Sequence, residues 1–339
     1  MVHMRIVVPA YQSEHVLDLL EGSPSACNVI FLERAARKPE GDVILCDVAA
    51  EDASVIVSDL RELDVDEEGS IAIEHIDSAV SSVAAKAERA AAGHGGDAVV
   101  WEEVESRTSE NTELDASFLA FMALACLIAA VGIFLDSPIL IVGAMIVGPE
   151  YGPLAGLCVA IVQRRRDVAR RSLRALVVGF PVGITAAFLF AVALRATDLD
   201  PVGFAATDHP LTDFISQPDR FSFIVAFIAG IAGALALTSS KSGALIGVLV
   251  SVTTIPAAAN IGVALAYGEW AEWRGAMLQL VVNLAAIVLA GTLTLFVQRR
   301  LYMRRRLAHL QDSSRAKAGL PVGHSRRTSS HRAKEPATK

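Results

Sequence analysis

Residues 136–156 read DSPILIVGAMIVGPEYGPLAG, an apolar stretch interrupted in its middle by GPEYGP. Proline removes a backbone N–H and clashes with the preceding helical turn, so Pro149 and Pro153 predict a break within an apolar helix. Residues 239–262, SSKSGALIGVLVSVTTIPAAANIG, repeat the plan with a polar turn, an apolar run and Pro256. Two interrupted apolar helices indicate a membrane domain whose irregular backbone lines protein or a cavity, because hydrocarbon offers no partner to an unpaired carbonyl.

The apolar character extends beyond these two stretches. Residues 114–298 contain only 10 Lys and Arg and 11 Asp and Glu. We expect about six membrane spans there, each near the roughly 20 residues that a bilayer core requires. Three spans in each half imply a 3+3 inverted-repeat-like arrangement, in which paired interrupted helices point to a transport site near the midplane. The predicted spans are 114–135, 138–162, 171–195, 221–238, 243–266 and 275–298.

Charge divides the chain into an acidic head, a nearly neutral middle and a basic tail. Residues 1–113 carry a net charge of −16 and residues 299–339 one of +10. Arginine-rich segments follow the second span, at 163–174, and the sixth, at 299–306. The positive-inside rule therefore predicts a multi-pass protein of the cell membrane with both termini in the cytoplasm. This composition excludes a wholly soluble enzyme, a fibrous repeat and a disulfide-rich secreted domain.

Residues 1–92 are expected to form a soluble α+β domain. The predicted order is βαββαβ, the order of the ferredoxin-like motif. Its acidic run at 62–68 favours a solvated loop over a cation site. Residues 93–113 are expected to form an acidic connector, and residues 301–339 a basic, disordered cytoplasmic tail. The predicted strands are 4–9, 28–34, 42–48 and 71–77, and the predicted helices are 13–21 and 52–63.

Polar residues beside the two interruptions are the candidates for a substrate or ion site. Glu150 is the foremost, because an ionisable residue within a span is a functional hypothesis by default. A helix that ended at Gly148 would instead bring Glu150 near the inner surface. Neither catalytic residues, nor a metal site, nor a cofactor are expected, since HExxH, G-x-S-x-G and CxxC motifs do not occur. The candidate set is Pro149, Glu150, Tyr151, Pro153, Thr253, Thr254, Pro256, Asn260 and Asn283.

The stretch GAMIVGPEYGP at 143–153, preceded by Ser-Pro at 137–138, resembles the signature of a bacterial and archaeal family, domain of unknown function 389 (DUF389). Members of that family pair a soluble N-terminal region with a set of membrane helices, and the family name implies no biochemical activity. Glu150 and Tyr151 stand where the family commonly has apolar residues. The residues that match the family pattern are Gly143, Ala144, Met145, Pro149, Gly152 and Pro153.

These features favour a transporter or channel-like membrane protein for a small solute or ion, with a regulatory head in the cytoplasm. The alternative is a ligand-sensing membrane protein, whose head binds a small metabolite and whose membrane domain anchors or signals. An enzyme is not expected. The expected partners are the lipid bilayer, an unknown small solute or ion, and further copies of the chain, since AGIAGALA at 229–236 permits close helix packing. Nucleic acid is not an expected partner.

Overall fold

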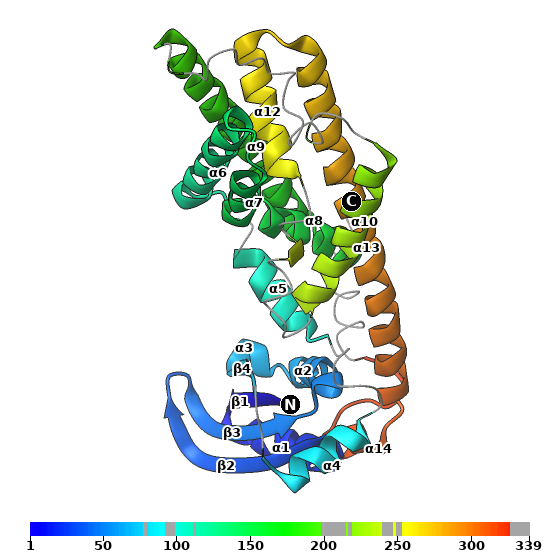
Figure 1. Ribbon diagram of the computed structural model, residues 1–339. Coiled ribbons are helices and arrows are strands. Elements are labelled where there is room, and N and C mark those ends of the chain that lie inside the picture. Colours follow the sequence, from blue (N-terminus) through cyan, green and yellow to red (C-terminus); the bar gives the residue numbers. More distant parts are fainter. Residues whose placement is uncertain are drawn as a thin grey trace, which may run out of the picture. The chain divides into compact units, whose positions relative to one another are not determined.

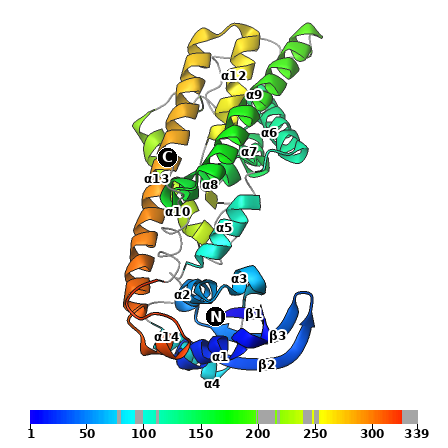
Figure 2. The same cartoon turned by 180° about the vertical axis from the view of Figure 1, so that it is seen from behind.

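The chain folds into two compact units, seen in a computed structural model (Figures 1 and 2). The head unit comprises Met1–Val104 and Gln298–Lys339, and the helical unit comprises Glu105–Val297. The structure describes residues 1–76, 80–91, 99–110, 113–197, 199, 215, 219–238, 247–248 and 253–325.

A four-stranded antiparallel sheet forms the centre of the head unit. Its strands lie in the order β2-β3-β1-β4. Along β1 every second residue is fully buried, which is the period of a strand with one face on a core. These residues are Val2, Met4, Ile6 and Val8. The strands are β1 (Val2–Val8), β2 (Ala26–Arg37), β3 (Glu40–Val48) and β4 (Ser70–His75).

Two amphipathic helices cover the buried face of this sheet. Leu19 and Leu20 of α1 and Ile56 and Leu60 of α2 share one core with the buried residues of β1. The acidic run at 62–68, expected as a loop, contains a short helix, α3, instead. The helices of the head are η1 (Ala10–Gln12), α1 (Ser13–Gly22), α2 (Ala50–Glu62), α3 (Val65–Glu68), α4 (Ser82–Ala90) and the start of α5 (Trp101–Glu110), which lies in the expected connector.

The chain after residue 300 differs from the expected disordered tail. Helix α13 (Trp270–His309) continues to His309, and α14 (Ser313–Lys317) follows it. Ala318 and Leu320 then pack into the same core as α1 and α2. Composition alone does not predict that this segment is ordered, because its basic residues pair with acidic residues that are distant in the sequence. Residues 326–339, the remainder of the expected tail, lie outside the described residues.

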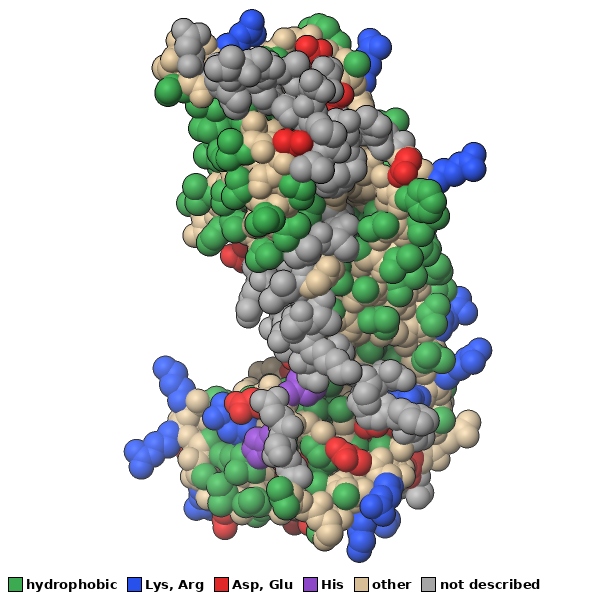
Figure 3. Space-filling model, viewed as in Figure 1, with side chains coloured by type: hydrophobic (Ala, Val, Ile, Leu, Met, Phe, Trp, Pro, Cys, Tyr) green, Lys and Arg blue, Asp and Glu red, His purple; other side chains and the backbone are tan. Residues whose placement is uncertain are grey.

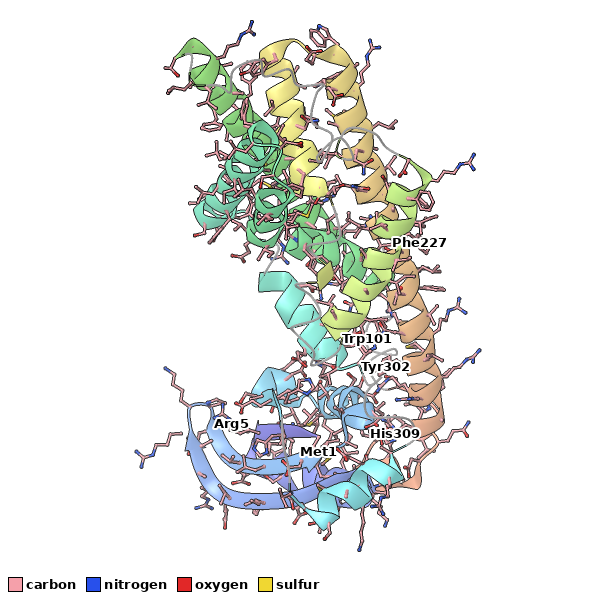
Figure 4. All side chains as sticks on the ribbon, viewed as in Figure 1. Met1, Arg5, Trp101, Phe227, Tyr302 and His309 are labelled. Atoms are coloured by element: carbon pink, nitrogen blue, oxygen red, sulfur yellow. The ribbon has the colours of Figure 1, made fainter. Side chains whose placement is uncertain are left out.

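A buried ion cluster holds this segment to the head. Asp59 and Glu62 of α2 are almost fully buried, and so is Arg315. Arg315 pairs with both carboxylates, while Arg306 donates to Glu62 with 2.7 Å between Nη2 and Oε1. His309, labelled in Figure 4, lies 2.8 Å from Asp59, measured from Nε2 to Oδ2. Charges this deep require partners, so α2 and the end of α13 are bound together.

The helical unit is built from apolar helices. Among the described residues, four are long and apolar enough to cross a membrane: α6 (Ala116–Phe134), α9 (Arg166–Ala196), α10 (Arg220–Thr238) and α13. The pair α7 (Pro138–Val147) and α8 (Tyr151–Gln163) makes a fifth if it is one span bent by 53°. Helix α12 (Thr254–Tyr267) is shorter. Four or five candidate spans are thus described, and most of the first half of the expected span 243–266 lies outside the described residues.

Apolar side chains lie on the outward faces of these helices as well as on the faces that pack against other helices. Figure 3 shows hydrophobic side chains on the visible faces of α6 and of α13, and large residues there such as Phe121 and Leu289 are exposed. An apolar exterior indicates a membrane protein, because water would disfavour it. Inside the unit, glycines bring helices close: an added Cβ at Gly183 of α9 would overlap Cys126 of α6. Helices α9 and α12 lie side by side in both views (Figures 1 and 2).

Candidate functional site

The first helix break lies between α7 and α8. Gly148 ends α7 in an extended conformation, with φ −63° and ψ 129°. Pro149 imposes this, because a residue before proline is pushed away from helical angles. Helix α8 then starts at Tyr151, with Glu150 as its N-cap residue. The sequence therefore places a carboxylate directly at the N-terminus of a half-helix, where backbone N–H groups favour negative charge.

The start of α12 resembles the start of α8, while residues 249–252, where the second break is expected, lie outside the described residues. Helix α12 starts at Thr254, and Thr253 is its N-cap residue. Pro256 is the third residue of α12, as Pro153 is the third residue of α8. Both prolines therefore lie in a first turn, where the missing N–H would have no intrahelical partner in any case. Neither Pro153 nor Pro256 therefore removes a hydrogen bond from inside a described helix, contrary to the expectation from sequence.

The two half-helices meet at their N-termini. Thr254 Oγ1 donates a hydrogen bond to Glu150 Oε1 over 2.7 Å, and both side chains are buried. Glu150 Oε2 has no hydrogen-bond partner among the residues that the structure describes. An added Cβ at Gly148 would overlap this oxygen and the side chain of Ile255. Glycine at 148 is thus what lets the carboxylate fold back against the end of α7.

A second polar layer joins α13 to this junction. Thr253 Oγ1 accepts from Asn283 Nδ2 at 2.9 Å and from Gln279 Nε2 at 3.2 Å. Gln279 and Asn283 are four residues apart, so they share one face of α13. The carbonyl oxygens of both amides have no partner within the described part of the chain. Gln279 was not among the expected site residues, although its spacing from Asn283 in an apolar helix is a signal for it.

Asn260 is the expected site residue that the structure does not bring to the junction. It is buried on α12, and its Oδ1 has no partner among the described residues. It lies six residues beyond Thr254, about 9 Å along the helix axis. No hydrogen bond in the described part of the chain joins it to Glu150, Thr253 or Thr254. Its amide therefore belongs to a separate position on α12.

Small cavities adjoin the carboxylate. The first, of about 10 Å³, has room for roughly one water molecule. A second cavity of the same volume shares Tyr151 and Ile287 with it and continues between α8, α10 and α13. The first is lined by Glu150, Tyr151, Leu154, Ala229, Val248, Thr254 and Ile287.

The short helices α8 and α12 both contact helices from the opposite half of the unit. Helix α8 packs on α10 and α13, where Gly233 lies against Tyr151 and Gly291 against Cys158. Helix α12 packs on α9 and α6, and an added Cβ at Gly262 would overlap the carbonyl oxygen of Ile184. Helix α12 thus packs mainly on helices of the first half, whereas α8 packs on α9 of its own half and also contacts α10 and α13.

Comparison with known proteins finds a family that part of this unit resembles. Residues 145–289 match the family model described as domain of unknown function (DUF389). This stretch of the helical unit is thus similar to DUF389 proteins. The resemblance carried by GAMIVGPEYGP is thereby confirmed, and the matched residues include the whole junction from Glu150 to Asn283.

One archaeal protein is also similar to part of this chain. The uncharacterized protein MJ0678 of Methanocaldococcus jannaschii is 25% identical over 193 residues, 57% of this chain and 58% of that protein. The chain therefore spans less than two thirds of this relative. No solved structure matches the chain. The DUF389 description assigns no activity, so function has to be argued from the junction itself.

Proposed function

We propose that the chain is an integral membrane transporter or channel-like protein for a small solute or ion, with its site where the two broken helices meet. One observation carries the proposal: Glu150 accepts from Thr254 across the two helix N-termini and keeps one buried oxygen without a described partner. A buried carboxylate is costly unless a partner compensates it, so a protein retains one there for a reason. Broken helices meeting inside an apolar bundle are a common construction of transport sites.

The proposal includes a six-span, inverted-repeat membrane domain. Two correspondences support it: Glu150 matches Thr253 as an N-cap residue, and Pro153 matches Pro256 at the third helical position. The proposed orientation places both termini in the cytoplasm. Leu199 is exposed beyond the end of α9, so in intact cells Leu199→Cys should react with an impermeant thiol reagent from outside. If the cysteine reacts only after lysis, the orientation of the chain is the reverse of the proposed one.

For the head we propose the ferredoxin-like fold. The strand order β2-β3-β1-β4, all antiparallel, and two covering helices support it. We further propose that the chain has no enzymatic activity and that it assembles as a homo-oligomer in the bilayer. Light scattering of the purified chain in detergent tests the assembly.

Flux through reconstituted vesicles tests the transport proposal. Purified full-length protein should carry at least one ion or small metabolite across the bilayer, and Glu150→Gln should reduce that flux at least tenfold. The matched control is Glu113→Gln, an exposed glutamate outside the helices. Equal flux from the wild type and both variants would show that Glu150 is not part of the transport site. Vesicles without flux of any tested ion or metabolite would count against transport altogether.

The second candidate function is ligand sensing by the head. The buried cluster of Asp59, Glu62, Arg306 and Arg315 favours it, since it ties α2 of the head to the end of α13, a helix whose beginning lies within the residues matched to DUF389. A metabolite that binds the head would then act on that helix. Such a ligand should raise the melting temperature of the full-length protein by mass action even where vesicles show no flux.

A further inference from the structure

The cavity beside Glu150 restricts what can bind there. Its volume of about 10 Å³ is close to that of one water molecule and far below that of a metabolite. Glu150 Oε1 is engaged by the Thr254 hydroxyl, while Oε2 is buried without a described partner. The species that compensates this carboxylate is therefore very small and carries a positive charge.

The described groups around Glu150 include no cationic side chain in the cavity lining. Of the residues that line the cavity, Glu150 and Tyr151 are the two that titrate, and the rest are Thr254 and apolar side chains. From α6, the thiol of Cys126 is close enough to interact electrostatically with Glu150. From α13, the facing polar groups are the neutral amides of Gln279 and Asn283. Within the described residues, Glu150 has neither Lys, Arg nor His beside it in this cavity.

Among the described residues, too few side-chain oxygens line the cavity to hold Ca²⁺ or Mg²⁺. Hard cations such as Ca²⁺ and Mg²⁺ take six or more oxygen ligands. Three lining residues carry side-chain oxygens, namely Glu150, Tyr151 and Thr254, and the remainder are Leu154, Ala229, Val248 and Ile287. Nor do the described residues include a group of three or more His, Cys, Asp or Glu that could hold a metal. A proton needs one acceptor and one water; Glu150 Oε2 is such an acceptor, and the cavity has room for roughly one water molecule.

We propose that the Glu150 carboxyl is a proton-binding site and that H⁺ is the ion that the junction carries or couples to transport. The movement of the proton rests on the proposed transport function, whereas its binding to Glu150 does not. A hydronium ion in the cavity gives its proton to Oε2, leaving a neutral carboxylic acid and one water. Release reverses the step. Thr254 is a positioning residue: its hydroxyl holds Oε1, so that Oε2 faces the cavity.

The neighbouring cavity gives the proton a direction. The two cavities share Tyr151 and Ile287 in their linings, and the second is also lined by small residues of α10 and α13, among them Gly230 and Gly291. The Tyr151 ring lies against Gly233, which leaves no room for a side chain there. A proton released from Glu150 passes Tyr151 through water to reach the second cavity.

Infrared spectroscopy of the full-length protein in lipid vesicles tests proton binding without requiring transport. Between low and high pH, the wild type should lose a protonated-carboxyl C=O band, and Glu150→Gln should lack that band at every pH. Glu113→Gln should retain it. Thr254→Val should shift the band, because Oε1 loses its hydrogen bond, and Thr254→Ser should restore its position. Identical difference spectra from the wild type and Glu150→Gln would overturn the proposal.

Proton flux, followed with a pH-sensitive dye trapped in the same vesicles, separates the two proposals. An imposed pH gradient should collapse at least tenfold faster with the wild type than with Glu150→Gln. If the Glu150 band is present but no solute crosses the bilayer, the transport proposal is wrong and the proton-binding proposal still holds. If solute flux does not depend on pH and the Glu150 band is absent, the proton-binding proposal is wrong and the transport proposal still holds. Size-exclusion profiles matching the wild type show that the variants fold.

Discussion

Arg315 is fully buried and donates to Glu62 with 2.8 Å between Nη2 and Oε2, although 253 positions separate the two residues. The same guanidinium pairs with Asp59. Two buried carboxylates of α2 thus depend on a residue close to the end of the described chain. This relationship explains why a basic segment that composition assigns to disorder is ordered against the head.

The cluster predicts a large cost for losing Arg315. Arg315→Met should destabilise the head by about 3 kcal/mol, because it removes the buried guanidinium that pairs with both carboxylates and leaves them only Arg306, His309 and Ser325. Denaturant unfolding of the full chain reports this through Trp101, which lies in the head near Tyr302, in a Trp270→Phe, Trp273→Phe background (Figure 4). Arg89→Met, on the exposed side of α4, is the control and should change stability by less than about 0.5 kcal/mol. Similar costs for both variants would contradict the cluster's role.

Asp42 predicts a pH dependence of head stability. The Ser13 hydroxyl and the Arg34 backbone N–H donate to its carboxylate at 2.5 and 2.7 Å, and they lower the pKa of Asp42 below its usual value. A pKa lower in the folded state stabilises the fold above the unfolded pKa of about 4, and this contribution is lost as pH falls through the folded-state pKa. The stability difference between the wild type and Asp42→Asn should be of order 1 kcal/mol at pH 7 and shrink below about pH 4. A difference that stays constant between pH 7 and pH 3 would contradict this.

Gly148 and Gly143 form a matched pair on α7. Gly148→Ala should destabilise the helical unit and reduce flux, because its Cβ would overlap the Glu150 carboxylate and Ile255. An added Cβ at Gly143 meets no described atom within 4 Å, so Gly143→Ala should be neutral or stabilise by up to about 1 kcal/mol. Melting temperatures in detergent and vesicle flux measure both. If Gly148→Ala behaves like Gly143→Ala, the carboxylate is not held against the end of α7.

Thr253 should be more important for its oxygen than for its shape. Thr253→Val keeps the volume but removes the acceptor shared by Gln279 and Asn283, which should cost about 1 kcal/mol for each lost hydrogen bond. Thr253→Ser retains the acceptor and should stay within about 0.5 kcal/mol of the wild type. Thermal unfolding in detergent compares the two variants. Equal melting temperatures would show that the amides of α13 find other partners.

Local pattern in the sequence determined several features correctly. The alternation in β1 identified a strand with one buried face, and the apolar stretches identified helices suited to a membrane. Pro149 located the break between α7 and α8, and Pro256 lies in the first turn of α12, whose preceding residues 249–252 lie outside the described part of the chain. These features follow from residues a few positions apart, because strand alternation, helix termination and proline geometry depend only on neighbouring dihedral angles.

Only the tertiary structure decided which distant residues meet. Glu150 and Thr254 are 104 positions apart, and Asp59 and Arg315 are 256 apart. Nothing in either local sequence specifies such a partner, because a buried charge requires only that some compensating group reach it. Asn260 shows the same limit: its residue type suggested the junction, but the 1.5 Å rise per residue of α12 carries it away from Glu150. Residue type made these groups candidates, and helix packing chose among them.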